Sequence, residues 1–319
     1  RAERILFVID ANRQMVTDAK GGLNSYKVIK DEITDMVGNL SAGTLFNIMI
    51  VDRRNFKLFR PQLVPSGQDI HQALIKWITP INQVASNPGL EGAAGAARAN
   101  ISALSEEPMH KNISWSAFRG NETAFVTQVA MEQQVDAIFM ITGYHRGFEL
   151  IRRLPTEREK ADWARTIAKK PYQDQLAKHQ LEITEMQRRV AAKLGAINKE
   201  RASKGQPPRV LYQRHGVYSN ARELGLEWKT PHPGSEPFYN VEARQVERYF
   251  RKLIDVLYTD KGAQEPSINV VLFLAGNEEM RAEWEKSLKD YVRFFNGKYR
   301  IIRGLDEIKS ASSAKSTNN

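Results

Sequence analysis

Three polar side chains follow one apolar run near the start of the chain, and their types could carry chemistry. Residues 5–9 are all apolar, and Asp10, Asn12 and Gln14 follow them at every second position. A carboxylate with neighbouring amides can coordinate a hard cation, and a carboxylate alone can act as a nucleophile. Whether either chemistry is retained depends on the elements that position these residues.

The apolar run predicts a strand buried on both faces, as in the centre of a parallel α/β sheet. Ligands bind at the carboxyl ends of such strands, so the loop that begins at Asp10 is the expected site. Further strands are predicted at 45–51, 56–59, 137–142, 268–274 and 299–302. Helices are predicted at 25–40, 66–81, 123–134, 172–202, 241–258 and 277–295. This order predicts an α/β fold with a doubly wound, mostly parallel sheet, one antiparallel edge strand and a helical insertion.

The composition limits the chemistry and the compartment. The 319 residues, 41% of them hydrophobic, suffice for one large domain with an insertion or for two domains. There is no cysteine, which excludes disulfides, thiolate zinc sites and cysteine nucleophiles. No apolar run reaches the roughly 20 residues of a membrane-spanning helix. The chain lacks an initiator Met and begins almost directly in a strand, so we expect that a signal peptide, a membrane anchor or a tag has been removed.

The net charge of +10 is concentrated in one segment. Between residues 151 and 215, sixteen Lys and Arg face seven Asp and Glu. A basic surface attracts anionic partners such as nucleic acid, lipid headgroups or acidic protein, although a solvated helix face has the same composition. The aromatic residues follow the basic helix and do not alternate with it, so nucleic acid is not the expected partner.

Residues 145–240 interrupt the α/β pattern and predict a basic insertion with helical and irregular parts. Its long helix carries apolar residues at 176, 183, 190 and 197, a heptad spacing typical of a helical hairpin or a short coiled coil. Residues 1–144 and 241–308 would form the α/β domain, and the polar residues 309–319 predict a disordered tail. We expect a second contact surface in the insertion, made by Arg188, Arg189, Tyr212, Tyr218 and Trp228.

Three segments in order resemble the von Willebrand factor A-like family, in its exported or membrane-anchored bacterial form. Residues 5–15, Ile-Leu-Phe-Val-Ile-Asp-Ala-Asn-Arg-Gln-Met, resemble the family's strand followed by Asp-x-Ser-x-Ser. Residues 45–77 follow its order of strand, antiparallel strand and helix. Residues 136–142 resemble the strand that ends in Thr-Asp-Gly. The resemblance covers 4–83, 121–144 and 241–303, and it leaves out the insertion.

Members of this family hold Mg²⁺ or Mn²⁺ in a metal-ion-dependent adhesion site. By the resemblance, Asp10 matches the first Asp, Asn12 and Gln14 replace two Ser, Thr123 stands for the Thr, and Gly143 replaces the second Asp. Because a single carboxylate remains, the resemblance implies a degenerate site with no metal and no cofactor. The rim would then contact another protein, or it is ordinary loop polarity. Its residues are Asp10, Asn12, Arg13, Gln14, Thr123, Gly143 and Tyr144.

A second family competes for the same residues. Haloacid-dehalogenase-like phosphatases also begin with a strand that ends in a nucleophilic Asp, here Asp10, and carry a Thr after a later strand, here Thr142. Asn12 stands in place of that family's acid/base Asp and cannot transfer a proton.

We therefore expect a non-enzymatic interaction or scaffolding domain without catalytic residues. Its partner would be another protein of a bacterial cell-envelope assembly, in the envelope or periplasm. The alternatives are the phosphatase, a protein that binds an anionic partner through the basic insertion, and a cytoplasmic location.

Overall fold

The computed structural model describes residues 3–53, 55–90, 93, 95–98, 101–115, 121–213, 216–276 and 278–303. The predicted tail at 309–319 lies outside these residues. The chain divides into two compact units: unit 1 comprises Arg1–Arg152 and Asn240–Asn319, and unit 2 comprises Arg153–Tyr239. Unit 2 begins later than the predicted 145, because Phe148 and Ile151 are buried in the core of unit 1.

Unit 1 is built on one mixed β-sheet. Its central strands run parallel, in the spatial order β2 (Leu45–Asp52), β1 (Arg4–Asp10), β6 (Ala137–Thr142), β7 (Ser267–Leu274) and β8 (Tyr299–Arg303). β3 (Asn55–Leu58) runs antiparallel to β2, as the predicted hairpin requires. β3 is not the outermost strand, because the short β5 (Ala97–Arg98) pairs with it, while β4 (Val64–Pro65) pairs with β2. The sequence order of the strands reverses between β1 and β6.

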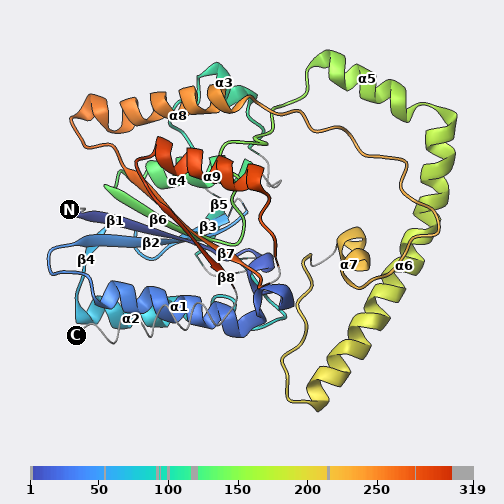
Figure 1. The fold of residues 1–319 in the computed structure, drawn as a ribbon, viewed down its shortest axis with the longest axis horizontal. Coiled ribbons are helices and arrows are strands. Elements are labelled where there is room, and N and C mark those ends of the chain that lie inside the picture. Colours follow the sequence, from blue (N-terminus) through green and yellow to red (C-terminus); the bar gives the residue numbers. More distant parts are fainter. Residues whose placement is uncertain are drawn as a thin grey trace. The chain divides into compact units, whose positions relative to one another are not determined.

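Helices cover both faces of the sheet (Figure 1). α1 (Gly22–Gly38) and α2 (Gln68–Ile78) lie on one face, and α4 (Asn121–Met131), α8 (Ala243–Leu257) and α9 (Ala282–Phe294) lie on the other. The alternation along β1 explains this arrangement. Leu6 and Val8 belong to the core beneath α4, α8 and α9, whereas Phe7 and Ile9 point to the opposite face. The short α3 (Pro108–Asn112) completes the second layer. α9 begins later than the predicted 277, a position outside the described residues.

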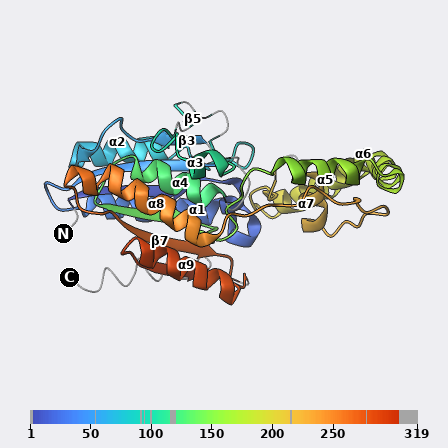
Figure 2. The same ribbon diagram turned by 90° about the horizontal axis from the view of Figure 1, so that it is seen from above.

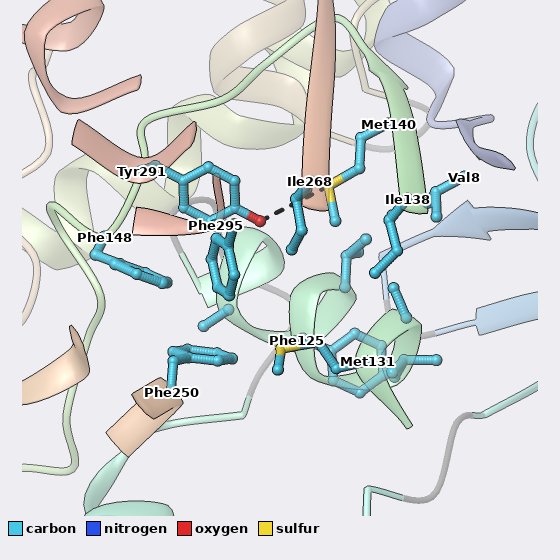
Figure 3. Packing of buried hydrophobic residues seen from close by; sticks show 14 of the residues in the cluster. Val8, Phe125, Met131, Ile138, Met140, Phe148, Phe250, Ile268, Tyr291 and Phe295 are labelled. Carbon is cyan, nitrogen blue, oxygen red and sulfur yellow. Dashed lines mark hydrogen bonds between the residues drawn. The ribbon is translucent and has the colours of Figure 1, made fainter. Parts of the chain in front are cut away.

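An aromatic cluster fixes the loop after β6 in this core (Figure 3). Phe148 stacks on Phe250 of α8 with ring centroids 4.9 Å apart, and it meets Tyr291 of α9 edge to face at 5.0 Å. The Tyr291 hydroxyl is hydrogen-bonded to Thr127 Oγ1 at 2.7 Å and lies 3.8 Å from Met140 Sδ. These contacts hold the segment after β6 against α9, next to the carboxyl ends of the strands.

Unit 2 contains α5 (Glu157–Ile167), α6 (Lys170–Ser203) and α7 (Val217–Glu223). α5 leads into the start of α6, and α7 lies beside α6 (Figure 1 and Figure 2). Pro171 does not interrupt α6, because it occupies the first turn, where its missing N–H has no helical partner. All residues of α6 belong to the described part of the chain, and two of them, His179 and Met186, are buried. The predicted heptad positions, starting at Leu176, are half-buried. Within the described ranges, no helix combines the length and the apolar character needed to cross a membrane.

Candidate functional site

Asp10 is the last residue of β1, and its buried carboxylate is hydrogen-bonded on both oxygens. Oδ1 accepts from the backbone N–H of Asn12 at 2.8 Å and from the Asn12 side-chain amide at 2.6 Å. Oδ2 accepts from Thr142 Oγ1 at 2.8 Å and from the Gly143 N–H at 3.4 Å. Because β1 and β6 are parallel neighbours, their carboxyl ends bring these groups together.

Asn12 joins Asp10 to a second carboxyl group that the sequence did not point to. Asn12 Nδ2 also donates to Glu122 Oε1 at 2.5 Å. Glu122 lies in the first turn of α4. Burial, and next the charge of Asp10, raise the pKa of Glu122 to about 8, although part of its surface still reaches solvent. At neutral pH Glu122 is therefore mostly protonated, and the rim carries less negative charge than its sequence indicates.

Lys20 occupies the space beside Gly143. A Cβ atom at Gly143 would lie 2.6 Å from Met15 Sδ and 3.5 Å from Lys20 Cε. The buried Lys20 Nζ donates to the carbonyls of Gly143 at 3.2 Å and Phe273 at 2.9 Å, and to Glu278 Oε2 at 2.5 Å. An ammonium group thus lies at the carboxyl ends of β6 and β7. No side chain fits at Gly143 unless its neighbours move.

A small cavity lies next to Asp10. Its volume is about 30 Å³, and its polar lining comprises Asp10, Glu122, Thr123, Thr142, Tyr144 and His145. This space holds about one or two water molecules, whereas ligand pockets typically span roughly 300–1,000 Å³. Thr123 is buried in this wall.

His145 is neutral in this wall. Its Nδ1 accepts from the Gly147 N–H at 3.1 Å, which leaves the ring proton on Nε2. Burial lowers the pKa of His145 to about 3. Nε2 is buried without a hydrogen-bond partner in the described part of the chain. An internal water in the cavity could satisfy it.

The residues at this rim do not fit a divalent cation. Protein donors already occupy both oxygens of Asp10, and Asn12 directs an N–H group, not an oxygen, between Asp10 and Glu122. Gly143 offers no side-chain ligand. Among the residues with a described structure, no group of three or more His, Asp or Glu is arranged to hold a metal ion.

The predicted rim residues share one edge of unit 1. Asp10 ends β1 and Asn12 comes two residues later, Gly143 and Tyr144 follow β6, and Thr123 lies in the first turn of α4. The 3₁₀-helix η1 (Arg13–Val16) begins with the half-buried Arg13 and Gln14. Sequence reasoning missed Glu122 and Lys20. A Glu directly before Thr123 was a readable signal, but the partners of Lys20 lie 123 to 258 positions away along the chain.

The predicted surface of unit 2 is partly internal. The ring of the buried His179 stacks on Tyr218 at 5.4 Å and meets Trp228 at 4.6 Å. Its Nδ1 lies 2.6 Å from the Thr230 carbonyl and its Nε2 lies 3.0 Å from the Tyr218 hydroxyl. Tyr218 therefore packs α7, and Trp228 packs the loop after α7, onto α6.

The remaining predicted residues of unit 2 lie apart from this ring cluster. Arg189 donates to the Glu227 carbonyl at 3.1 Å, and the Tyr212 N–H donates to Glu223 Oε2 at 2.9 Å. The Arg188 side chain is 76% exposed. Arg188 and Tyr218, which is 42% exposed, are therefore the members of the predicted surface best placed to meet a partner.

No protein-family model matches this chain, and no curated protein matches it. Among solved structures, the PilB minor pilin from Streptococcus sanguinis is 13% identical with a TM-score of 0.35, and a point mutant of that pilin is 11% identical with a TM-score of 0.36. Each match covers 98% of this chain and 60% of the other chain, so this chain spans less than two thirds of the pilin's length. Similarity at this level does not establish a shared fold.

Proposed function

We propose that this chain is a non-enzymatic protein-interaction or scaffolding domain of the von Willebrand factor A-like type, with a degenerate metal site. The hydrogen bonding of Asp10 carries the proposal. By the resemblance, its carboxylate lies where that family places a metal ligand. In this chain, N–H and O–H groups of Asn12, Thr142 and Gly143 contact the carboxylate in place of a cation. The rim therefore keeps its shape without an ion.

The strand order supports the same proposal. Numbered along the chain without the two-residue strands, the sheet has the order 3-2-1-4-5-6, which is typical of doubly wound α/β proteins. In such sheets partners and ligands bind where the order reverses, at the carboxyl ends of the strands. Asp10 and Thr142 terminate the two strands at this reversal.

The burial of Asp10 argues against a phosphatase. A nucleophilic carboxylate must reach the substrate, but Asp10 is 4% exposed and the adjoining cavity measures about 30 Å³. Asn12, which stands in place of the acid/base residue, is hydrogen-bonded to Asp10 and Glu122 and has no proton to transfer. We therefore propose a function without catalysis.

A bacterial cell-envelope or periplasmic location belongs to this proposal. It rests on the resemblance to exported and membrane-anchored family members and on the lack of cysteine. The partner is another protein of the same assembly.

Calorimetric titration with Mg²⁺ and Mn²⁺ tests the degenerate site. We expect no stoichiometric uptake by the wild-type chain and no difference for the Asp10→Ala variant. Tight, stoichiometric uptake that is lost in Asp10→Ala would contradict the proposal.

Photo-crosslinking tests the interaction. A crosslinking amino acid is placed at Gln14 on the rim and, as a control, at the exposed Val256 near the end of α8. We expect a protein from an envelope extract to be captured at Gln14 and not at Val256. This protein, once identified and purified, should bind Arg13→Glu more weakly than wild type. Equal capture at both positions would argue against a docking rim.

An anionic partner for unit 2 is the second candidate. The excess of basic residues between 151 and 215 and the exposure of Arg188 favour it. Salt-dependent retention on heparin at near-physiological ionic strength would support this role, and elution together with an uncharged control protein would remove it.

A further inference from the structure

Arg146, in the loop that follows β6, lies between two aromatic rings. Its guanidinium carbon is 3.7 Å from the centre of the Trp284 ring and 4.9 Å from that of Tyr144. Both rings attract the cation, and Arg stacks well because its guanidinium is planar. We propose that Arg146 is the docking point for a carboxylate of the partner, so that an acidic segment of a protein binds this rim. This inference rests on the proposed function and names the chemistry of its partner.

The terminal nitrogens of Arg146 are available for such a partner. Within the described residues, the guanidinium of Arg146 makes no ion pair. Its Nε is buried without a hydrogen-bond partner, whereas neither Nη atom is among the buried unpaired atoms. Two other arginines beside aromatic rings are already paired. Arg153 forms a two-pronged pair with Glu159, and Arg281, which also lies over Trp284, has Glu283 at 3.6 Å. The end of the guanidinium that carries its two Nη atoms can therefore make a bidentate contact with a carboxylate.

The backbone around Arg146 is held rigidly before any partner arrives. Gly147 has a φ of 57°, and a Cβ atom there would lie 2.3 Å from the Ser287 carbonyl oxygen, so the loop packs directly on α9. Ser287 Oγ donates to the Arg146 carbonyl at 2.7 Å.

The face of α9 that holds this loop also carries Trp284. Trp284, Ser287 and Tyr291 recur at the spacing of one helix face, and the Tyr291 ring contacts His145 at 4.4 Å. The stacked arginine is therefore positioned in advance, which lowers the ordering cost of binding.

The surroundings favour one carboxylate over a polyanion. Nucleic-acid backbones are bound by several basic side chains spaced along the phosphates. Of the two arginines over the Trp284 ring, Arg281 is paired with Glu283, so one guanidinium, that of Arg146, is left for a partner. A single bidentate contact matches an Asp or Glu side chain of a folded or extended partner.

Fluorescence anisotropy with the full chain tests this inference. The probe is a short fluorescein-labelled peptide that carries one Glu as its acidic residue, and its counterpart carries Gln at that position. The variants are Arg146→Gln, Trp284→Ala and, as a control of equal charge change, Arg293→Gln, whose side chain is 80% exposed on the same helix. We expect the wild type to prefer the acidic peptide. Arg146→Gln and Trp284→Ala should weaken its binding by at least about tenfold, and Arg293→Gln by less than about twofold.

Three results would overturn the inference: equal binding of both peptides, equal losses in Arg146→Gln and Arg293→Gln, or no binding by the wild type. The crosslinking experiment at Gln14 keeps the two proposals separate. If Arg146→Gln still captures the same protein with the same yield, the role of Arg146 is wrong and the docking rim stands. If capture falls with Arg146→Gln and not with Arg293→Gln, both are supported.

Discussion

Helices α8 and α6 show how differently the two units are held together. α8 has 15 residues and buries Val246, Tyr249, Phe250, Leu253, Ile254 and Leu257 against the sheet. α6 has 34 residues and buries two, His179 and Met186. Apolar residues recur along both helices in the sequence, but they meet a large core only in unit 1.

Polar contacts take the place of a core in unit 2. The Glu182 carboxylate accepts from the backbone N–H groups of Lys229 at 2.7 Å and Thr230 at 2.8 Å, and these bonds hold the pKa of Glu182 below its usual value. Exposed pairs such as Lys204 with Glu200 add little, because water screens them. The comparison teaches that unit 1 is stabilised by buried area, and unit 2 by a few specific contacts around His179.

The largest effect is expected from Phe250→Ala in unit 1. Phe250 is fully buried and stacks on Phe148, so its removal leaves a cavity and should lower the free energy of unfolding by about 3–5 kcal/mol. Urea denaturation followed by circular dichroism measures it. The control is Leu181→Ala on α6, where the side chain is 83% exposed and the loss should stay below about 0.5 kcal/mol. Similar losses for both variants would contradict the conclusion that buried area stabilises unit 1.

In unit 2 we expect His179→Ala to have the largest effect. It removes the hydrogen bonds to Thr230 and Tyr218 together with the ring that Trp228 packs on, a loss of about 1–3 kcal/mol. Hydrogen exchange should accelerate in α6 and α7 and stay unchanged in the strands of unit 1. Unchanged exchange in α6 would show that the ring cluster does not hold unit 2 together.

The elements of unit 1 could be predicted because their apolar runs are long. β1, β2, β6 and β7 are read directly from buried stretches, and α8 from its periodic apolar residues. α5 was missed because it has few apolar residues, although its capping pattern, Thr156 followed by Glu159, was a readable signal. The two-residue strands β4 and β5 leave no pattern, since pairing with a neighbour alone defines them.

The positions of rim residues could be predicted only for residues at the ends of neighbouring parallel strands. Asp10 and Gly143 converge because β1 and β6 are parallel neighbours, which follows from the order of elements. The stacking of Arg146 on Trp284 depends on how the loop packs on α9, and periodicity does not encode this contact. Such tertiary contacts decide whether an arginine is paired, and they are the part that sequence reasoning could not reach.

The pH dependence of the free energy of unfolding should report on Glu122 at the rim of unit 1. Because the pKa of Glu122 rises from 4.5 to about 8 on folding, the folded chain keeps a proton that the unfolded chain releases. The contribution of Glu122 to the free energy of unfolding should therefore be most favourable below about pH 4.5 and fall as the pH rises to about 8, by on the order of 1 kcal/mol, since solvent screens part of the effect. Urea denaturation across this range measures it, and Glu122→Gln should flatten the slope. An unchanged slope would assign the effect to another group.

The smallest effect on stability is expected at the start of α5, a helix that has an exposed capping box and no buried residue. Thr156 Oγ1 accepts from the Glu159 N–H at 3.3 Å, and the Glu159 carboxylate accepts from the Thr156 N–H at 2.8 Å and pairs with Arg153. The hydrogen bonds from Arg153, and next that from the Thr156 N–H, lower the pKa of Glu159 to about 2. The cap should therefore persist above about pH 4.5 and weaken as the pH falls toward 2, opposite in sign to Glu122.

Thr156→Ala removes the hydroxyl acceptor of this cap and should cost about 0.5–1 kcal/mol, because the helix is exposed and the Arg153 pair remains. Hydrogen exchange at the Glu159 N–H measures the loss locally. Thr156→Ser keeps the acceptor and should exchange as slowly as the wild type. If Ser and Ala exchange equally fast, the helix start depends on the Arg153–Glu159 pair and not on the hydroxyl. Unit 2 would then depend on ion pairs even where its sequence offers a cap.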